Sequence, residues 1–255
     1  KIIQPSNLKS SSFIEELNLL DSDLFVVVAF RMLPKSVWTI PRLGTINLHA
    51  SLLPDYRGAA PINWVIINGE KNTGVSTFFI NENIDTGDII DQRSIKIDIL
   101  DSYGDLYHKL KKIGADLVLD SVNNIIENKI NLKPQINTSN LNSANKLNKE
   151  NCKIDWTQPG NTILNLIRGL SPYPAAWSYI KDETAEWNVK FYEATFEATT
   201  HNKKAGTIFT TKKDFIIYTT DGFLKITCLQ FPGKKKMQAH ELLNGITFTE
   251  NAVAQ

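Results

Sequence analysis

The chain has 255 residues, of which 42% are hydrophobic and 22% are charged, and its formal net charge is +1. This composition is typical of a soluble globular protein with one large domain or two smaller ones. No apolar run approaches the roughly 18 residues of a membrane-spanning helix, and the first residues lack the pattern of a secretory signal. The two cysteines, Cys152 and Cys228, have no metal-ligand spacing, so reduced thiols in a cytoplasmic protein are expected.

Residues 23–29 form a continuous β-branched run, which predicts a buried parallel strand. A strand at residues 45–49, a helix at 60–68, strands at 74–80 and 89–97 and a helix at 102–128 are predicted to follow. This alternation predicts an α/β domain over residues 1–130, with an open, mostly parallel Rossmann-like sheet. Such sheets usually have more strands before the central one, so we expect the domain to be N-terminally incomplete.

Residues 131–150 are rich in asparagine and poor in large apolar side chains, which predicts a linker. Beyond it, a short helix at residues 161–169 and strands at 176–180, 189–196, 206–210, 215–219 and 224–229 are expected. Short strands separated by glycine turns predict a small OB-like β-barrel over residues 151–255. Residues 131–255 are also mildly basic. This charge is compatible with a polyanionic partner, although it equally suits an ordinary solvated surface.

Two polar residues near the end of the second predicted strand point to chemistry. Asn47 and His49 are two positions apart, so their side chains project to the same face of an extended strand. Asp85 belongs to an Asp-Thr-Gly-Asp turn after the next strand, and it is expected at the same rim of the sheet. Each residue alone is more often a surface or turn residue. Together, an amide donor, a titratable ring and a carboxylate suit acyl transfer through an oxyanion.

The nearest hydroxyl, Ser51, precedes Leu-Leu-Pro and does not lie in a Gly-x-Ser-x-Gly elbow. Direct transfer without a covalent acyl-enzyme is therefore expected.

Several stretches carry a resemblance that covers residues 23–245. They are VVVAFRMLPKSVW, INLHASLLPDYRGAAPINWVIINGEKNTGVSTF, IDTGDII, IDW and LQFPGKKKMQAHELLNG. Through them the chain resembles the methionyl-tRNA formyltransferases of the formyltetrahydrofolate-dependent transferase superfamily. The N-x-H, SLLP and DTGD motifs mark the superfamily in general. The RGAAPI motif and the TDGFLKITCLQFPGKKKM run single out the tRNA enzymes.

The resemblance implies formyl transfer from the co-substrate 10-formyltetrahydrofolate to the α-amine of methionyl initiator tRNA, without a metal. It implies a cytoplasmic monomer with no membrane partner. The catalytic residues would be Asn47, His49 and Asp85. The folate would contact Ser51, Leu52, Leu53 and Pro54. Its pterin ring would lie between the backbone of residues 81–86 and the side chains of Phe30, Met32 and Leu33, although Phe30 and Met32 equally suit core packing.

The resemblance also directs attention to basic residues. Arg31 occupies a position where many members of the family carry a small residue, and we expect its guanidinium to point to solvent. Contact with tRNA is expected from Lys234, Lys235 and Lys236, with Lys203, Lys204, Lys212 and Lys213 as weaker candidates.

Three other functions stay open at this point. A sugar-amine formyltransferase acting on a nucleotide sugar would share the SLLP segment but would not need a basic C-terminal barrel. An inactive folate- or RNA-binding fragment is a non-catalytic alternative, against which the three intact polar residues argue. A formyl-folate hydrolase would need no basic second domain.

Overall fold

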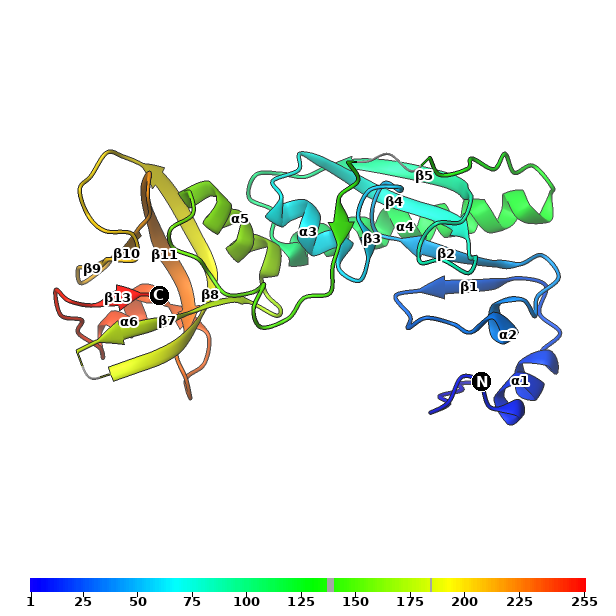
Figure 1. Cartoon of the computed structure of the whole chain (residues 1–255), viewed down its shortest axis with the longest axis horizontal. Helices are drawn as coiled ribbons and strands as arrows, with labels where there is room; N and C mark the ends of the chain where they lie inside the picture. The colour runs from blue at the N-terminus through cyan, green and yellow to red at the C-terminus, as the bar shows by residue number, and fades with distance from the viewer. Residues whose placement is uncertain (137–139, 184) are drawn as a thin grey trace. The chain divides into compact units, whose positions relative to one another are not determined.

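The computed structural model describes residues 1–136, 140–183 and 185–255. The chain divides into two compact units (Figure 1). The first consists of residues 1–61, 72–96 and 108–145, and the second of residues 62–71, 97–107 and 146–255. The predicted domain boundaries at residues 130 and 150 remain a prediction. Residues 137–139 of the predicted linker lie outside the described residues.

The first unit is built on a four-stranded sheet with the order β1-β2-β4-β5. These strands are β1 (Phe25–Val28), β2 (Thr45–His49), β4 (Asn72–Phe79) and β5 (Ile89–Lys96). Strand β1 runs parallel to β2, whereas β2–β4 and β4–β5 are antiparallel. The predicted α/β class is confirmed, but the sheet is mixed, so the description of it as mostly parallel was wrong. Residues 80–88 between β4 and β5 are too few for a crossover, and two strands so closely joined pair antiparallel.

One face of this sheet is covered by the long helix α4 (Tyr103–Ile126), of which residues 108–126 belong to the first unit. Ile46 of β2, Ile90 of β5 and Ile125 of α4 form a buried cluster. Leu48 packs against Gly114 of α4, where any larger side chain would meet the leucine. Even-numbered residues of β2 therefore face the helix, and odd-numbered residues face the opposite side.

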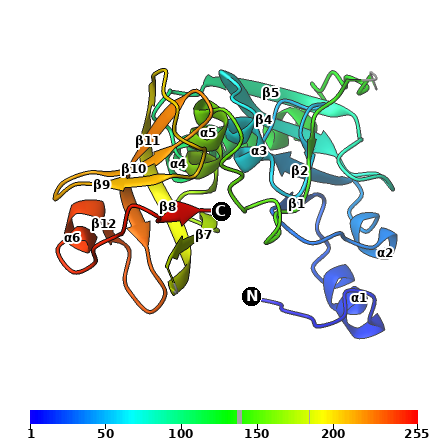
Figure 2. The same ribbon diagram turned by 60° about the vertical axis from the view of Figure 1, so that its left-hand side comes forward.

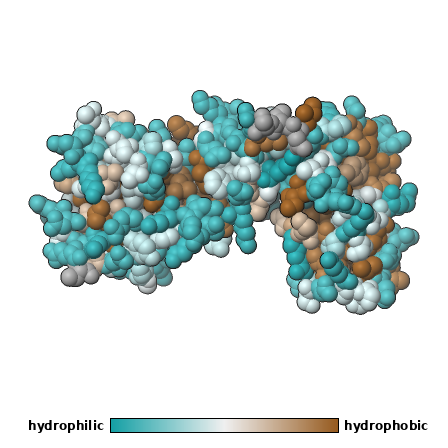
Figure 3. Space-filling model, viewed as in Figure 1, coloured by the Kyte–Doolittle hydropathy of each residue, from teal (hydrophilic) through white to brown (hydrophobic). Residues whose placement is uncertain are grey.

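Strand β1 is the edge of the described sheet, and it pairs with β2 alone. Val26 and Val28 are 44% and 54% exposed, so the prediction of a buried strand was wrong. A continuous β-branched run does not distinguish a central strand from an edge strand, because both favour the same side chains. Apolar residues are visible at the surface of the first unit in Figure 3. The smaller elements of this unit are α1 (Ser11–Asn18), α2 (Lys35–Trp38), β3 (Arg57–Gly58) and β6 (Ser143–Ala144).

The second unit is an antiparallel β-barrel, which confirms the predicted fold (Figure 2). Its strands are β7 (Ala176–Asp182), β8 (Ala185–Ala198), β9 (Ile208–Thr210), β10 (Phe215–Tyr218), β11 (Gly222–Gln230), β12 (Met237–Gln238) and β13 (Val253–Ala254). The order is β13-β7-β8-β11-β10-β9, with β12 paired to β11. A bridge between Thr207 and Val253 brings the two ends of the sheet together and nearly closes it.

The barrel encloses the larger hydrophobic core of the chain. The same unit contains helices α5 (Gly160–Leu170) and α6 (Ala239–Leu243) and residues 62–67 of α3 (Pro61–Ile67). Ile163 and Ile167 of α5 and Leu242 of α6 contribute to the core from outside the strands. In the described ranges, no helix has the length and apolarity that a membrane span requires.

We expect Phe191→Ala to destabilise the barrel by about 3–5 kcal/mol, because truncating a buried aromatic ring leaves a cavity. Phe191 is fully buried, and its ring lies 5.6 Å from that of Trp156 in an edge-on contact. Urea unfolding followed by near-UV circular dichroism measures the change. Phe209→Ala is the matched control, because Phe209 is 50% exposed, and this variant should unfold within about 1 kcal/mol of the parent. Equal losses in the two variants would contradict the assignment of the core.

Candidate active site

The predicted site residues Asn47 and His49 lie on the face of the sheet opposite α4. In the register with β4, Asn47 is opposite Phe78 and His49 is opposite Ser76. Side chains alternate between the two faces along a strand. Ile46 and Leu48 are directed to the face that α4 covers, so Asn47 and His49 are directed to the opposite face. One strand thus presents an amide and an imidazole side by side.

A loop formed by residues 50–56 covers part of this face, and hydrogen bonds to the Ser76 side chain hold it in place. The Ser76 hydroxyl donates to the Ser51 carbonyl (2.6 Å) and accepts from the Leu53 amide (3.1 Å). Gln92 of β5 donates to the same hydroxyl (2.7 Å) and to the Leu53 carbonyl (3.0 Å). The loop is therefore fixed to both neighbouring strands through buried polar groups.

The four residues predicted to contact folate differ in accessibility. Ser51 is fully buried, and its hydroxyl donates to the Asp55 carbonyl (2.6 Å). Leu53 is 3% exposed and packs with Phe78 and Ile89. Leu52 and Pro54 are half-buried, so they are the side chains of this loop that a ligand could reach. Their role in folate binding remains a prediction.

The imidazole of His49 has partners at both nitrogens. Its Nε2 lies 2.8 Å from the Tyr56 carbonyl oxygen, and its Nδ1 lies 3.7 Å from Oδ2 of Asp85. A carbonyl oxygen only accepts, so Nε2 must carry a proton. A neutral His49 therefore has a free lone pair on Nδ1. A second proton would be placed at Nδ1, beside the Asp85 carboxylate.

Asp85 is held by backbone contacts from both sides. The Gly58 amide donates to its Oδ2 (2.9 Å), and its side chain is only 14% exposed. Its φ of +53° lies in the left-handed region that non-glycine residues rarely adopt. Two residues later, a Cβ on Gly87 would lie 1.7 Å from the Phe79 carbonyl oxygen. The Asp-Thr-Gly-Asp turn therefore needs glycine at this position to approach β4 so closely.

Gln135, which is 50 residues from Asp85 in the sequence, supports the same turn. Its amide nitrogen donates to the carbonyls of Asp85 (3.0 Å) and Gly87 (2.7 Å). Its amide oxygen accepts from Arg57 Nε (3.0 Å) and a terminal guanidinium nitrogen (2.6 Å). The Gln135 side chain therefore links the turn that carries Asp85 to Arg57 of β3. Arg57 directly follows Tyr56, whose carbonyl contacts His49.

The Asn47 amide is available for a ligand. Asn47 is half-buried, and its side chain makes no hydrogen bond among the residues that the structure describes. A half-buried amide on the same strand face as His49 is accessible to a substrate group that could complete its hydrogen bonds. His49 and Asp85 thus lie together, and Asn47 is presented on the same face of β2 as His49. The catalytic role of all three remains a prediction.

Two contacts of the candidate site were absent from the sequence-based prediction. The Tyr56 carbonyl is a backbone group, so no side-chain pattern could reveal it. Gln135 lies within the predicted linker, and no motif there indicated that it would reach the Asp-Thr-Gly-Asp turn. The segment also contributes β6, which pairs with β3.

The predicted pterin-contacting side chains are accessible. Phe30 is 55% exposed and Met32 is 70% exposed. Met32 and Leu33 border a cavity of about 720 Å³ that residues 6–9 and 31–36 line. Arg31 is exposed, and its guanidinium donates to the Pro5 carbonyl (2.8 Å). That the guanidinium points to solvent remains a prediction.

The lysines predicted to contact tRNA are exposed on the barrel. Within the run of three, Lys236 is already engaged, because its Nζ lies 3.4 Å from Glu193 and 4.7 Å from the centre of the Tyr192 ring. Lys234 and Lys235 carry the uncompensated charge of this turn. Their contact with RNA remains a prediction.

Comparisons with known proteins agree over both units. Residues 1–122 match the family model described as formyl transferase, and residues 146–247 match the model of the formyl transferase C-terminal domain. The chain is 52% identical over 251 residues to a protein named methionyl-tRNA formyltransferase from Flavobacterium johnsoniae. The match covers 98% of this chain and 80% of that protein.

Two solved structures are also similar. HypX from Aquifex aeolicus in complex with tetrahydrofolic acid is 23% identical with a TM-score of 0.68, covering 90% of this chain and 40% of that one. At this identity the likeness concerns the fold alone. WlaRD, a sugar 3N-formyl transferase solved with dTDP and 5-N-formyl-THF, is 25% identical with a TM-score of 0.63. That match covers 86% of this chain and 77% of that one.

We expect neutral His49 to be the Nε2-protonated tautomer, because the Tyr56 carbonyl accepts its proton. Long-range ¹H–¹⁵N correlation spectra of ¹⁵N-labelled protein above the titration range of histidine distinguish the two tautomers. His49→Ala assigns the signal, and the exposed His240 provides an internal reference. A neutral His49 protonated at Nδ1 would contradict the hydrogen bond to Tyr56.

Proposed function

The chain belongs to the formyl transferase family, and we infer that it is a methionyl-tRNA formyltransferase. It transfers the formyl group of 10-formyltetrahydrofolate to the α-amine of methionine on initiator tRNA. The observation that carries this conclusion is 52% identity to an enzyme of that name over 98% of the chain, barrel unit included. We further propose that the protein acts in the cytoplasm as a monomer.

We propose that the reaction begins with attack of the neutral amine on the formyl carbon. An α-amine has an ordinary pKa near 8, so a substantial fraction is neutral close to physiological pH. As the new C–N bond forms, the formyl oxygen becomes an oxyanion. The Asn47 amide donates a hydrogen bond to this oxygen. Because the strand already holds the amide in position, the donor does not have to reorient as the negative charge develops.

His49 and Asp85 complete the stabilisation of the oxyanion in this proposal. Nε2 donates a hydrogen bond to the Tyr56 carbonyl, so Nδ1 is the nitrogen that can interact with the reacting groups. Protonated His49 places positive charge near the oxyanion, and the carboxylate of Asp85 at 3.7 Å stabilises that charge. Collapse of the tetrahedral intermediate breaks the bond between the formyl carbon and N10 of the folate. The amine gives up its proton, and N10 takes one up.

We propose that the folate lies against the loop of Ser51, Leu52, Leu53 and Pro54. The accessible side chains of Leu52 and Pro54 would contact it directly, while Ser51 and Leu53 fix the shape of the loop from within. The exposed Phe30 and Met32 would border the pterin ring, with the backbone of residues 81–86 opposite them.

The function is tested by supplying 10-formyltetrahydrofolate with one of two acceptors. Methionyl initiator tRNA should be formylated, whereas a nucleotide-linked amino sugar should not. The sugar arm is the relevant alternative because WlaRD, a sugar 3N-formyl transferase, shares the fold and 25% of the sequence. Formylation of the sugar with no product on the tRNA would overturn the proposed function.

We expect Asn47→Ala to lower kcat by about 10²–10³, because one oxyanion donor is lost. The KM for methionyl-tRNA should change little, since Asn47 acts on the reacting carbonyl. Steady-state formylation kinetics measure both constants. Asn123→Ala, an exposed asparagine on α4, is the control and should behave as the parent. A variant that keeps its kcat and loses affinity would exclude the oxyanion role.

Asp85→Asn separates the charge of Asp85 from its place in the backbone. Asparagine tolerates a positive φ and can still accept from the Gly58 amide, so the turn should keep its shape. We expect kcat to fall by about 10²-fold or more with thermal stability retained. Asp85→Ala should lose both activity and stability. If Asp85→Asn were fully active, the carboxylate would have no part in supporting protonated His49.

A further inference from the structure

The side chain of Gln135 makes four hydrogen bonds, all to groups beside the candidate active site. Its amide nitrogen donates to the carbonyl oxygens of Asp85 (3.0 Å) and Gly87 (2.7 Å). Its amide oxygen accepts two hydrogen bonds from the guanidinium of Arg57 (2.6 and 3.0 Å). A primary amide has two N–H donors and one oxygen with two lone pairs, so these four bonds use its whole capacity. Gln135 therefore has no polar group left with which to bind a substrate.

The partners of this amide also fix its orientation. A carbonyl oxygen only accepts and a guanidinium only donates, so a flipped amide would oppose all four of its neighbours. The backbone places the side chain. Lys133, two residues before Gln135, exchanges two backbone hydrogen bonds with Ile89, two residues after Gly87 (both 2.9 Å). The amide is thus held in one position at both its base and its tip.

The two ends of the amide act on the two partners of the buried ion pair. The nitrogen holds the turn that carries Asp85. The oxygen holds Arg57, whose neighbours in the chain contact both members of the pair. The Tyr56 carbonyl accepts from His49 Nε2 (2.8 Å), and the Gly58 amide donates to Asp85 Oδ2 (2.9 Å). One side chain therefore joins the segment that orients the imidazole to the segment that bears the carboxylate.

The distance between His49 and Asp85 depends on how these two segments are joined. Nδ1 and Oδ2 are 3.7 Å apart, which is longer than an ordinary hydrogen bond. The two side chains are only 8% and 14% exposed, so solvent screens their interaction weakly. A small displacement of the turn relative to Arg57 would therefore change how strongly the carboxylate stabilises a protonated ring.

The segment that carries Gln135 also holds the other edge of the stretch around Tyr56. The Tyr56 amide donates to the Asn142 carbonyl (2.7 Å), and the Ala59 amide donates to the Ala144 carbonyl (2.7 Å). In return, the Asn142 amide donates to the carboxylate of Asp55 (3.0 Å). The asparagine-rich stretch that the sequence predicts as a linker thus contributes to the polar frame of the candidate site.

We propose that Gln135 is a positioning residue for formyl transfer, which sets the distance between His49 and Asp85. The inference rests on the proposed function, in which protonated His49 and the Asp85 carboxylate stabilise the oxyanion. It adds to that function a residue that touches neither the substrates nor the reacting atoms. Because Gln135 acts through the ion pair, its contribution is to turnover and not to the binding of either substrate.

Gln135→Glu separates the two ends of the side chain. A carboxylate still accepts from Arg57, but it has no N–H to donate and would face two carbonyl oxygens. We expect kcat to fall by about 10–100-fold and each KM to stay within about twofold, because the turn is displaced and no substrate contact is lost. Steady-state formylation kinetics measure both constants. Gln158→Glu, the same change at an exposed glutamine of the barrel unit, is the matched control and should behave as the parent.

A double-mutant cycle with Asp85→Asn distinguishes positioning from a general loss of structure. If Gln135 acts through the Asp85 carboxylate, Gln135→Glu should change kcat by less than about twofold once that carboxylate is absent. The same fold-loss of kcat in both backgrounds would overturn the proposal, because the two residues would then act independently. A parental kcat in Gln135→Glu alone would overturn it as well.

Gln135→Met serves if Gln135→Glu does not fold. Methionine has a similar length and removes all four hydrogen bonds without placing a negative charge against the two carbonyl oxygens. Near-UV circular dichroism establishes which variants are folded, and the same cycle with Asp85→Asn is then measured. A folded Gln135→Met with parental kcat would exclude the positioning role.

The ¹⁵N signals of His49 test the proposal without any substrate. They should shift in Gln135→Glu, because Nδ1 faces the carboxylate that moves, and they should keep their parental positions in Gln158→Glu. Unchanged signals in folded Gln135→Glu would overturn the positioning role, whatever the activity of the chain. A parent chain that does not formylate methionyl-tRNA would instead overturn the proposed function. An active parent with an equally active Gln135→Glu would overturn this inference alone.

Discussion

The buried hydroxyl of Ser76 is the contact on which the candidate active site depends. It lies opposite His49 in the sheet and uses its hydrogen-bonding capacity on Ser51, Leu53 and Gln92. These bonds fix the loop of residues 50–56 over the sheet. The loop in turn brings the Tyr56 carbonyl within 2.8 Å of His49 Nε2. The tautomer of the His49 ring is thus set by a fully buried serine that cannot itself touch a substrate.

A second set of contacts fixes the carboxylate. Asp85 adopts a costly left-handed backbone, which persists only where surrounding contacts determine it. The Gly58 amide, the close approach of Gly87 to β4 and the two hydrogen bonds from Gln135 provide them. Both charged partners of the proposed reaction are therefore positioned before any substrate arrives. This preorganisation is what makes polar groups effective in stabilising a transition state.

The sequence predicted the parts of this site that depend on local periodicity. Asn47 and His49 share a face because side chains alternate along any strand, and the return of Asp85 to the same rim follows from the order of the elements. Strand direction was harder to predict, because the side chains of β4 suit parallel and antiparallel pairing alike.

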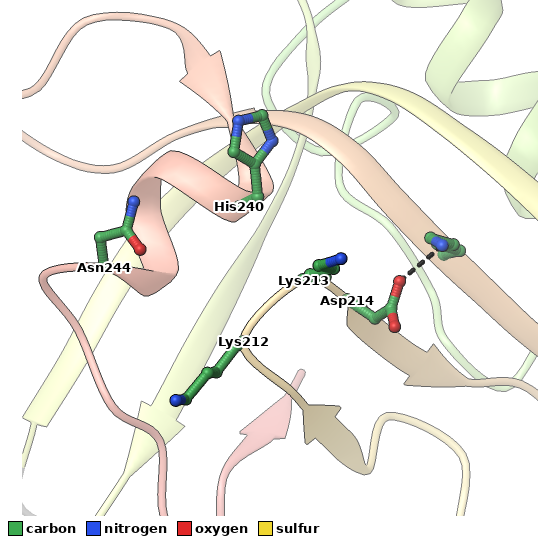
Figure 4. Close-up of a pocket in the computed structure, with 6 residues that line it drawn as sticks. Lys212, Lys213, Asp214, His240 and Asn244 are labelled. Carbon is green, nitrogen blue, oxygen red and sulfur yellow. Dashed lines mark ion pairs between the residues drawn. The ribbon is translucent and has the colours of Figure 1, made fainter.

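Contacts made by backbone atoms or across long sequence separations could not be predicted. The Tyr56 carbonyl has no side-chain signature, and Gln135 is 50 residues from Asp85 in an asparagine-rich segment. The grouping of side chains around one hollow on the barrel (Figure 4) also escaped prediction. Lys212 and Lys213 were visible as a pair, but Lys225 and His240 join them only once the barrel has formed.

Formyl transfer by itself does not select an acceptor. Any neutral amine that reaches the formyl carbon can attack it, so the roles proposed for Asn47, His49 and Asp85 would serve tRNA and amino sugars equally well. Selection must come from groups that bind the rest of the acceptor. For a tRNA that remainder is mostly phosphodiester, which calls for cations at fixed positions. A nearly closed barrel exposes few unpaired strand edges, so its turns and outer face are free to present lysines. The acceptor specificity of this chain is therefore expected to reside in the barrel, while the chemistry resides on the sheet.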